Sequence, residues 1–223
     1  TDVLLGAFPD AVSSSWSAYL YPWSDTSKNG TYAPKKVVSV HDGVLDKYIH
    51  TEGSEHLVAA VLPKVPGSSK YGTLYGRYEV RFRSERLPGY KIAWLLWPDS
   101  GTNTTGAVGG GGNGEIDFPE MNLDATEVAG FVHHQNATVN NDQSMSKASV
   151  DISTWHTYTF EWSPNLVVFY LDGVEIGRHT ERIPNTAMHW VLQTETSLGG
   201  STPRDDVRGH VEIDYVSFWK YAP

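Results

Sequence analysis

The 223-residue sequence contains no cysteine. This absence excludes disulfide bonds, a thiolate nucleophile, and zinc or iron–sulfur sites that need sulfur ligands. Basic residues are few, with 17 Lys and Arg against 26 Asp and Glu and a net charge of −9, so binding to nucleic acid or to an anionic membrane surface is disfavoured. No apolar run approaches the roughly 20 residues of a membrane-spanning helix.

Amphipathic helical patterns are also missing. No window keeps apolar residues at a period of 3.6, whereas 8 Trp, 12 Tyr and 21 Gly favour aromatic-rich strands joined by tight turns. The clearest strand covers 74–83, LYGRYEVRFR, where apolar and charged residues alternate. Asp172 and Gly173 predict a tight hairpin turn after one of the other strands. Further runs that predict strands are KKVVSV (35–40), HLVAAV (56–61), TYTFEW (157–162), LVVFYL (166–171), WVLQTE (190–195) and HVEIDYVSF (210–218).

Many short strands without helical crossovers predict an all-β chain, either an antiparallel sandwich or a barrel. No change of composition marks a domain boundary, so we expect residues 1–223 to form a single domain. The one low-complexity stretch, SGTNTTGAVGGGGNG (100–114), holds seven glycines. It lacks the Gly-Lys-Ser/Thr ending and the following helix of a phosphate-binding loop, so we interpret it as a mobile loop.

The segment GEIDFPEM (114–121) places three carboxylates within six residues, Glu115, Asp117 and Glu120. On a strand, Glu115 and Asp117 face the same side because side chains alternate. Glu120 is out of phase by one residue, unless a β-bulge returns it to that face. Pro119 cannot donate a ladder hydrogen bond, so it suits a bulge better than a regular central strand position.

Three like charges on one face cannot all ionise at their ordinary pKa values, so at least one pKa is expected to be raised. An acid and a nucleophile that act together on a glycosidic bond need such a difference. The alternatives are a solvated acidic turn and a calcium loop. Ile116 and Phe118 argue against both, because they would anchor the opposite face of the strand in the core.

The pattern Glu-x-Asp-x-x-Glu, written here as EIDFPE, resembles the signature of glycoside hydrolase family 16 in the bulged form found in laminarinases. The resemblance covers most of the chain. YGRYEVRFR resembles the strand before the family's cleft, KIAWLLWP its tryptophan-rich strand, WHTYTFEW and FYLDGVEIGR the paired strands after the motif, and VEIDYVSFW the closing strand. It implies a β-jelly roll, a sandwich of two curved antiparallel sheets whose concave face forms a cleft for a polysaccharide.

By matching positions, the resemblance implies that Glu115 is the nucleophile, Asp117 its electrostatic and hydrogen-bonding helper, and Glu120 the general acid/base of a retaining enzyme. The expected reaction is endo-hydrolysis of a neutral β-linked polysaccharide by double displacement, with β-1,3- or mixed-linkage glucan as the first choice. An agarose-type galactan, transglycosylation and a non-catalytic carbohydrate-binding jelly roll stay open as alternatives. A lectin would not need all three carboxylates, which favours the catalytic hypothesis.

Aromatic residues near the motif are candidate platforms for sugar rings, whose apolar C–H faces stack on aromatic planes. Trp94 matches the cleft tryptophan of the family's Trp-Pro-Ala-Phe-Trp stretch, although Tyr90 and Lys91 stand at its earlier Trp-Pro positions. Tyr90, Trp94 and Trp97 are therefore candidate substrate-binding residues. Trp94 and Trp97 are three apart, so they lie on opposite faces of a regular strand and one of them is expected to be buried.

The resemblance also implies a cleft-lining position for His133 in GFVHHQN, with His134 on the opposite face of the strand. Gln193 and Glu195 share one strand face in WVLQTET, near the family's cleft-side asparagine. Glu195 would either tune Glu120 or bind sugar hydroxyls. His133, Gln193 and Glu195 complete the predicted substrate-binding set.

No cofactor is expected to be required. Many members of the family hold a structural calcium ion on the convex side, and the matching positions here are Gly43 in HDGVLD and Asp214 in VEIDYV. Carbonyl and carboxylate oxygens suit a hard cation, but an exposed strand aspartate explains Asp214 equally well. The expected partner is a polysaccharide, with no nucleic acid and no membrane, and the protein is expected to be a secreted, extracellular monomer.

Overall fold

The computed structural model describes residues 15–65, 72–100, 112–139, 141–199 and 202–223. The central part of the glycine-rich stretch, 101–111, lies outside the described residues, so its interpretation as a loop stays a prediction. Within these ranges the chain forms β-strands and one four-residue helix, α1 (Pro34–Val37). No helix of the described chain is long and apolar enough to cross a membrane.

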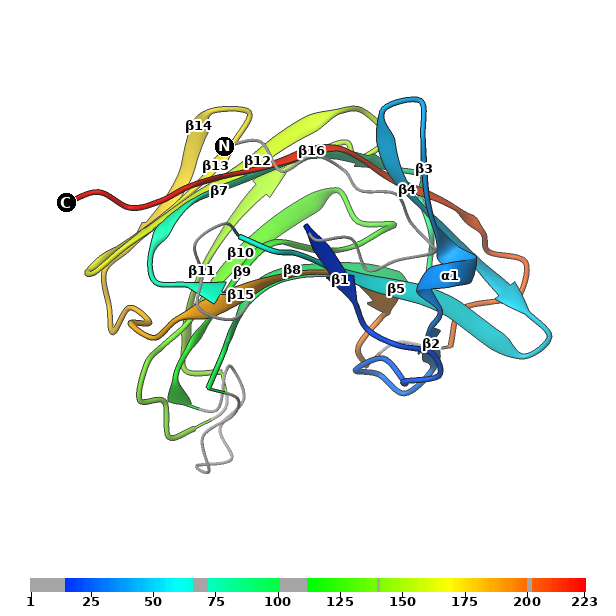
Figure 1. Ribbon diagram of the computed structural model, residues 1–223, viewed down its shortest axis with the longest axis horizontal. Coiled ribbons are helices and arrows are strands. Elements are labelled where there is room, and N and C mark those ends of the chain that lie inside the picture. Colours follow the sequence, from blue (N-terminus) through cyan, green and yellow to red (C-terminus); the bar gives the residue numbers. More distant parts are fainter. Residues whose placement is uncertain (1–14, 66–71, 101–111, 140, 200–201) are drawn as a thin grey trace.

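The strands form two curved layers packed face to face (Figure 1). The first layer runs in the order β11 (Gln143–Ser149), β10 (Glu127–His133), β9 (Glu115–Asn122), β8 (Tyr90–Pro98), β15 (Met188–Thr196) and β5 (Glu55–Pro63). The second runs in the order β4 (Val44–Glu52), β16 (Gly209–Trp219), β7 (Gly76–Ser84), β12 (His156–Ser163), β13 (Leu166–Leu171) and β14 (Val174–His179). Neighbours along this order are antiparallel, and the pairing of β4 with β5 joins the two layers. Four short strands pair with β5, β4 and β15, namely β1 (Trp16–Ala18), β2 (Gly30–Tyr32), β3 (Val38–His41) and β6 (Gly72–Thr73).

Alternation along the strands builds the core between the layers. In β7, Tyr78, Val80 and Phe82 are almost fully buried, while the charged residues between them lie on the outer face. Aromatic rings fill much of the space: Tyr78 stacks on Phe160 and meets Trp190 of the other layer edge to face. Burial of this apolar surface is the main term that stabilises the sandwich. The expectation of an all-β jelly roll of two curved antiparallel sheets is confirmed.

Local predictions agree with the structure at the hairpin and differ from it at one strand. Asp172 and Gly173 connect β13 to β14 with φ angles of 51° and 78°, which Asp and Gly tolerate. The run at 35–40 is not a single strand, because Pro34 opens α1 and β3 begins only at Val38. Proline is favourable at the first helical position, where its missing N–H would have no partner.

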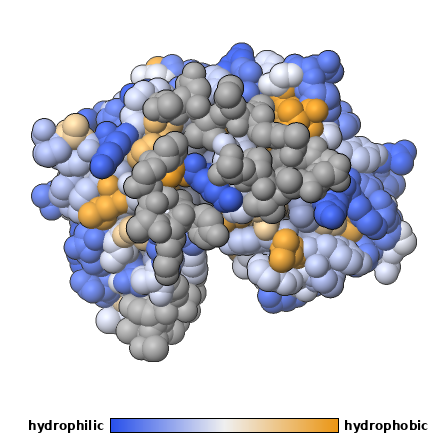
Figure 2. Space-filling view, viewed as in Figure 1, coloured by the Kyte–Doolittle hydropathy of each residue, from blue (hydrophilic) through white to orange (hydrophobic). Residues whose placement is uncertain are grey.

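The outer face of the first layer is concave. Strands β8, β9 and β15 arch toward the second layer in Figure 1, and the molecular surface is hollowed on that side in Figure 2, which otherwise shows a mainly hydrophilic surface with separate hydrophobic patches. At the other end of the strand order, Ser146 of β11 and His179 of β14 form a 2.8 Å hydrogen bond. The two layers are therefore in contact on both sides.

Candidate active site

Strand β9 contains the bulge predicted for the acidic motif. On β8, Ala93 pairs with Glu120 and Leu95 pairs with Asp117, so two steps along β8 face three steps along β9. The same shift occurs against β10 on the other side of β9. The extra residue returns Glu120 to the face that carries Glu115 and Asp117, and all three carboxylates line one cavity.

The opposite face of β9 holds the motif in place. Ile116 and Phe118 are fully buried, and the ring of Phe118 packs against Tyr158 and Phe169 of the second layer. The prediction that these two apolar residues anchor the strand is confirmed. The carboxylates therefore project from a rigid element and not from a solvated turn.

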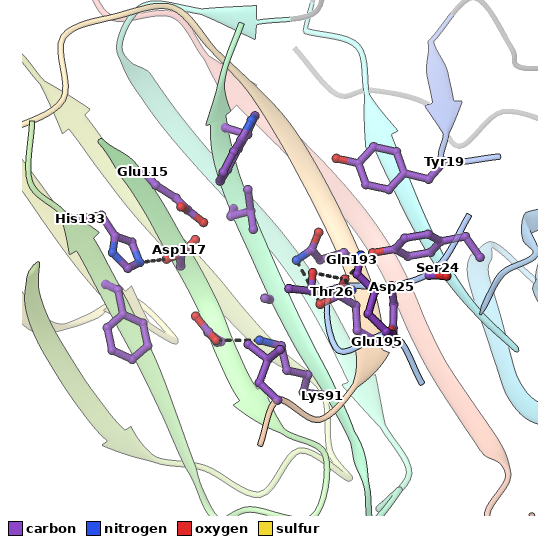
Figure 3. Close-up of a pocket in the computed structure, with 18 of the residues that line it drawn as sticks. Tyr19, Ser24, Asp25, Thr26, Lys91, Glu115, Asp117, His133, Gln193 and Glu195 are labelled. Atoms are coloured by element: carbon purple, nitrogen blue, oxygen red, sulfur yellow. Dashed lines mark hydrogen bonds and ion pairs between the residues drawn. The ribbon is translucent and has the colours of Figure 1, made fainter. Parts of the chain in front are cut away.

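The cavity is an open cleft of about 680 Å³ on the concave face. Alternate residues of β8, β9, β10 and β15 form its floor, and the segment 19–32, which runs from the end of β1 through β2, forms one wall. Figure 3 shows Glu115, Asp117 and His133 on one side of the cleft, with Lys91 between them and a second group made of Thr26, Asp25, Gln193 and Glu195. The other lining residues are Tyr19, Trp23, Ser24, Lys28, Tyr32, Ala93, Leu95, Trp97, Glu120, Phe131, Asn141, Gln143 and Leu198.

Glu115, Asp117 and His133 form a tight group, in which one oxygen or nitrogen from each lies within 4.8 Å of the others. The Nε2 atom of His133 lies 3.0 Å from an Asp117 oxygen. Burial opposes the charged form of His133, but the hydrogen bond and charge of Asp117, with the charge of Glu120, outweigh it and raise the pKa of His133. The Oδ1 atom of Asp117 is buried and has no hydrogen-bond partner among the described residues.

Glu120 lies in a different environment from the other two carboxylates. Burial and the neighbouring charge of Asp117 raise the pKa of Glu120, although Lys91 and His133 oppose this shift. Its Oε1 atom accepts a hydrogen bond from the Lys91 ammonium at 3.0 Å. A raised pKa keeps a proton on Glu120 at higher pH, as a general acid requires. The expectation that at least one of the three carboxyl groups has a raised pKa is confirmed.

Two of the three predicted aromatic platforms are wrong. Along β8 the odd-numbered residues from 91 to 97 line the cleft, and the even-numbered residues face the core between the layers. Tyr90 and Trp94 are therefore fully buried, and Trp94 packs against Phe82 of the second layer with ring centroids 4.5 Å apart. Trp97 lines the cleft, which confirms the expectation that one tryptophan of the pair is buried. The resemblance to the family implies Trp94 as the cleft tryptophan, and the structure places Trp97 there instead.

We expect Trp97→Ala to weaken substrate binding without a large loss of stability. Loss of one stacking surface should raise KM by about fivefold, because an aromatic contact contributes on the order of 1 kcal/mol. The matched variant Trp94→Ala should instead lower the free energy of unfolding by about 3–5 kcal/mol, because it leaves a cavity in the core. Steady-state kinetics and thermal denaturation of both variants test this, and an equal loss of stability in the two would contradict the assignment.

Sequence reasoning missed the wall formed by segment 19–32. Tyr19 and Trp23 line the cleft with ring centroids 6.0 Å apart, and Trp23 is 56% exposed. The wall is fastened to β15 by Asp25, whose carboxylate accepts hydrogen bonds from the amide and hydroxyl of Thr196 at 2.8 and 2.6 Å. The segment has no periodic pattern, so only its density of aromatic residues could have indicated a role.

Gln193 and Glu195 line the cleft as predicted, and the hydrogen bonds of Glu195 fasten the same wall. Its Oε1 atom accepts from the amide and hydroxyl of Thr26 at 3.2 and 2.8 Å and from the hydroxyl of Tyr32. Its Oε2 atom accepts from Gln193 at 3.3 Å. These contacts assign Glu195 an anchoring role, while a direct effect on Glu120 stays a prediction.

The donor set predicted for calcium fits the ion poorly. The Asp214 carboxylate forms an ion pair with Arg81 of the neighbouring strand β7, so a guanidinium already supplies the positive charge that a cation would bring. Gly43 lies in the turn between β3 and β4 with a φ of 82°. This geometry does not support the predicted calcium site, and no step of the chemistry depends on it.

A concave cleft that presents two carboxyl groups in different environments, one of them with a raised pKa, is the arrangement of a glycoside hydrolase. Residues 63–217 match the sequence model of glycosyl hydrolases family 16, and the chain belongs to this family. Most families of glycoside hydrolases cleave the glycosidic bond with a pair of carboxyl groups and without a cofactor.

Curated relatives of the chain are named beta-glucanase. The Bacillus subtilis (strain 168) enzyme is 30% identical over 112 residues, which are 50% of this chain and 43% of that protein. The Paenibacillus polymyxa enzyme is 31% identical over 158 residues, which are 68% of this chain and 61% of that protein. The chain thus spans less than half the length of the first relative and about three fifths of the second.

Solved structures with the same fold include two bacterial glucan hydrolases. The Bacillus licheniformis beta-glucanase aligns with a TM-score of 0.76 at 16% identity, over 99% of this chain and 97% of that chain. The laminarinase catalytic domain from Thermotoga maritima aligns with a TM-score of 0.74 at 18% identity, over 98% and 97% of the two chains. At this level of identity the likeness establishes the jelly-roll fold.

Proposed function

We propose that the protein is a retaining endo-hydrolase of a neutral β-glucan with β-1,3 or mixed β-1,3/1,4 linkages. The observation that carries the proposal is the bulge in β9, which places Glu115 and Glu120 on one face of a rigid strand in different environments. Glu115 is 8% exposed beside Asp117 and His133, whereas Glu120 contacts Lys91 and has a raised pKa. Two carboxyl groups with separate roles are what a double displacement requires.

In the first step, Glu120 donates its proton to the glycosidic oxygen while Glu115 attacks the anomeric carbon. The bond to the leaving sugar breaks, and a glycosyl ester forms on Glu115. In the second step, Glu120, now a carboxylate, removes a proton from water as the water oxygen attacks the anomeric carbon and releases Glu115. Two inversions retain the anomeric configuration.

Asp117 supports Glu115 through both steps. It lies next to Glu115 on the same face of β9 and receives a hydrogen bond from His133, whose raised pKa favours the imidazolium form. An imidazolium at this place balances the charge of Asp117 beside Glu115. The arrangement holds charge and hydrogen bonds where the oxocarbenium-like transition state develops.

The charge of the cleft favours a neutral polymer. Five carboxyl groups line it, against three basic groups, Lys28, Lys91 and His133, the carboxyl groups being those of Asp25, Glu115, Asp117, Glu120 and Glu195. Such a surface repels sulfated or uronic sugars, which require cationic clefts. The aromatic wall of Tyr19 and Trp23 and the indole of Trp97 offer planes for neutral pyranose rings. The relatives named beta-glucanase support a glucan over a galactan.

An open cleft accepts the interior of a chain, which supports endo-cleavage. We also propose that the protein acts as a monomer outside the cell, where polymeric glucans are found. Transglycosylation, in which a sugar hydroxyl replaces water in the second step, shares the same intermediate and is distinguished by longer products.

Reducing-sugar release and product profiling on a panel of polysaccharides test the function. The panel is laminarin, mixed-linkage glucan, agarose, carrageenan and xyloglucan, with Glu115→Ala as the inactive control. We expect release from laminarin or mixed-linkage glucan that disappears in the control. Binding to these polymers without any release would instead indicate a carbohydrate-binding module, and release from agarose alone would overturn the glucan assignment.

A further inference from the structure

Lys91 occupies a place in the cleft that the proposed reaction has not yet used. It lies on β8, on the face that also carries Ala93, Leu95 and Trp97, and it is only 6% exposed. Its ammonium group lies 3.0 Å from the Oε1 atom of Glu120, a contact that Figure 3 draws as a dashed line from Lys91.

The register of the sheet explains why Lys91 reaches Glu120. Ala93 lies directly opposite Glu120 on β9, and Lys91 is two residues before Ala93 on the same face of β8. Diagonal neighbours in antiparallel strands are within reach of long side chains. Ala93, the next residue after Lys91 on that face of β8, has a small side chain that does not block the ammonium group from the carboxyl group.

Burial makes this lysine costly. A lysine with so little exposure loses most of its hydration. An ion pair offsets the free-energy cost of this desolvation only when its geometry is good. An apolar side chain at the same place would avoid that cost. The flanking cleft residues of β8 are apolar, so the charge of Lys91 is a local exception directed at one carboxyl group.

Three charged groups surround Glu120 on the strands packed against it. They are Asp117 on its own strand, Lys91 on β8 and His133 on β10. Asp117 disfavours ionisation of Glu120, whereas the two cationic groups favour it. Lys91 is the one of these that donates a hydrogen bond directly to Glu120.

We propose that Lys91 is a positioning residue that orients the carboxyl group of Glu120 and sets the pH range over which this group can alternate between acid and base. The inference rests on the proposed function, in which Glu120 must give up a proton in the first step and accept one in the second. A group held too strongly in its protonated form would act slowly as a base. The ammonium of Lys91 stabilises the carboxylate that the second step needs, and the hydrogen bond fixes the direction of the Oε1 atom.

Lys91→Met and Lys91→Arg test the proposal, because methionine keeps the length of the side chain without its charge and arginine keeps the charge. The rate falls at high pH as Glu120 loses its proton, so the high-pH limb of kcat/KM reports its ionisation. We expect this limb to move up by about one pH unit in Lys91→Met, because an opposite charge at this distance is removed. We expect kcat to fall by about tenfold or more and KM to change little, because orientation of the acid is lost.

In Lys91→Arg, both the high-pH limb of kcat/KM and the value of kcat should return toward those of wild type. Lys36→Met is the matched control, because Lys36 forms a 2.5 Å ion pair with Glu52 on the outer surface and does not line the cleft. This control should show the wild-type profile. A high-pH limb that stays in place in folded Lys91→Met would overturn the proposal, as would an equal effect of Lys36→Met.

A readout that needs no turnover separates this inference from the proposed function. Carboxyl-carbon NMR of ¹³C-labelled protein follows the titration of Glu120, with Glu120→Gln used to assign its resonance. We expect the Glu120 titration midpoint to lie higher in Lys91→Met than in wild type. An unchanged Glu120 midpoint in Lys91→Met rejects the role of Lys91. If the midpoint shifts in Lys91→Met but the wild-type protein hydrolyses none of the polysaccharides, only the proposed function is rejected.

Discussion

Glu115→Ala is expected to lower kcat on a β-glucan by about 10⁴-fold or more, because removal of a nucleophile abolishes the covalent route. Binding of the polysaccharide should persist, since the aromatic wall and Trp97 are untouched. The fold should also persist, because Ile116 and Phe118 anchor β9 from its other face. Initial rates, affinity gel electrophoresis with laminarin and thermal denaturation measure the three quantities.

Glu120→Ala gives the complementary result. Loss of the general acid should cost about 10²–10⁴-fold on a polysaccharide and much less on an aryl glycoside whose leaving group needs no proton. With the aryl glycoside, azide should restore activity in this variant as a small nucleophile that needs no base, and should give a β-glycosyl azide. Glu127→Ala, at the exposed start of β10, is the control and should behave as wild type. Azide rescue of Glu115→Ala with a β-azide product would contradict the assigned roles.

The second large expected effect is on the pH dependence of protein stability, which a lysine buried in the core should dominate. Lys47 of β4 is fully buried between the layers, where its ammonium donates to the carbonyl of Leu192 at 2.6 Å and to the hydroxyl of Thr194 at 3.3 Å. It lies 5.3 Å from the centroid of the Trp94 ring. Burial lowers the pKa of Lys47 to about 7. The unfolded chain keeps a lysine pKa of about 10.4.

Between these two pKa values the unfolded state binds more protons than the folded state, so the free energy of unfolding rises with pH. Below pH 7 Lys47 contributes its full destabilisation, and the effect fades as pH approaches 10. Between pH 7 and 9.5 we expect the free energy of unfolding of wild type to rise by about 3 kcal/mol relative to that of Lys47→Met.

Urea denaturation of wild type and Lys47→Met at both pH values measures this difference, since other titrating groups cancel between the two proteins. Lys35→Met is a matched control, because Lys35 is exposed on α1. A difference between wild type and Lys47→Met that does not change with pH would contradict the lowered pKa of Lys47.

The sequence was most informative where a local pattern determines a local structure. Alternation in 74–83 predicted β7, Asp172 and Gly173 predicted the hairpin turn, and the spacing of EIDFPE with Pro119 predicted the bulge of β9. Each of these depends on side-chain period or on backbone preference within a few residues. The structure adds that Glu115, Asp117 and Glu120 meet in one cleft.

Other features depend on long-range packing. When a strand such as β8 has apolar residues on both faces, its sequence does not reveal which face lines the cleft. For this reason the prediction for Tyr90 and Trp94 is wrong, and Lys91 stands out in the sequence only as a departure from the family pattern. The wall at 19–32 is fixed by hydrogen bonds from Thr26 to Glu195, 169 residues away. Periodicity within a segment carries no information about such partners.

The stereochemistry of hydrolysis tests the central claim most directly. Proton NMR of the first products released from a β-glucan distinguishes the α and β anomers before mutarotation. The double displacement by Glu115 and Glu120 predicts that the β anomer appears first and converts slowly to the equilibrium mixture. First appearance of the α anomer would show a single inverting displacement and would contradict the role of Glu115 as a nucleophile.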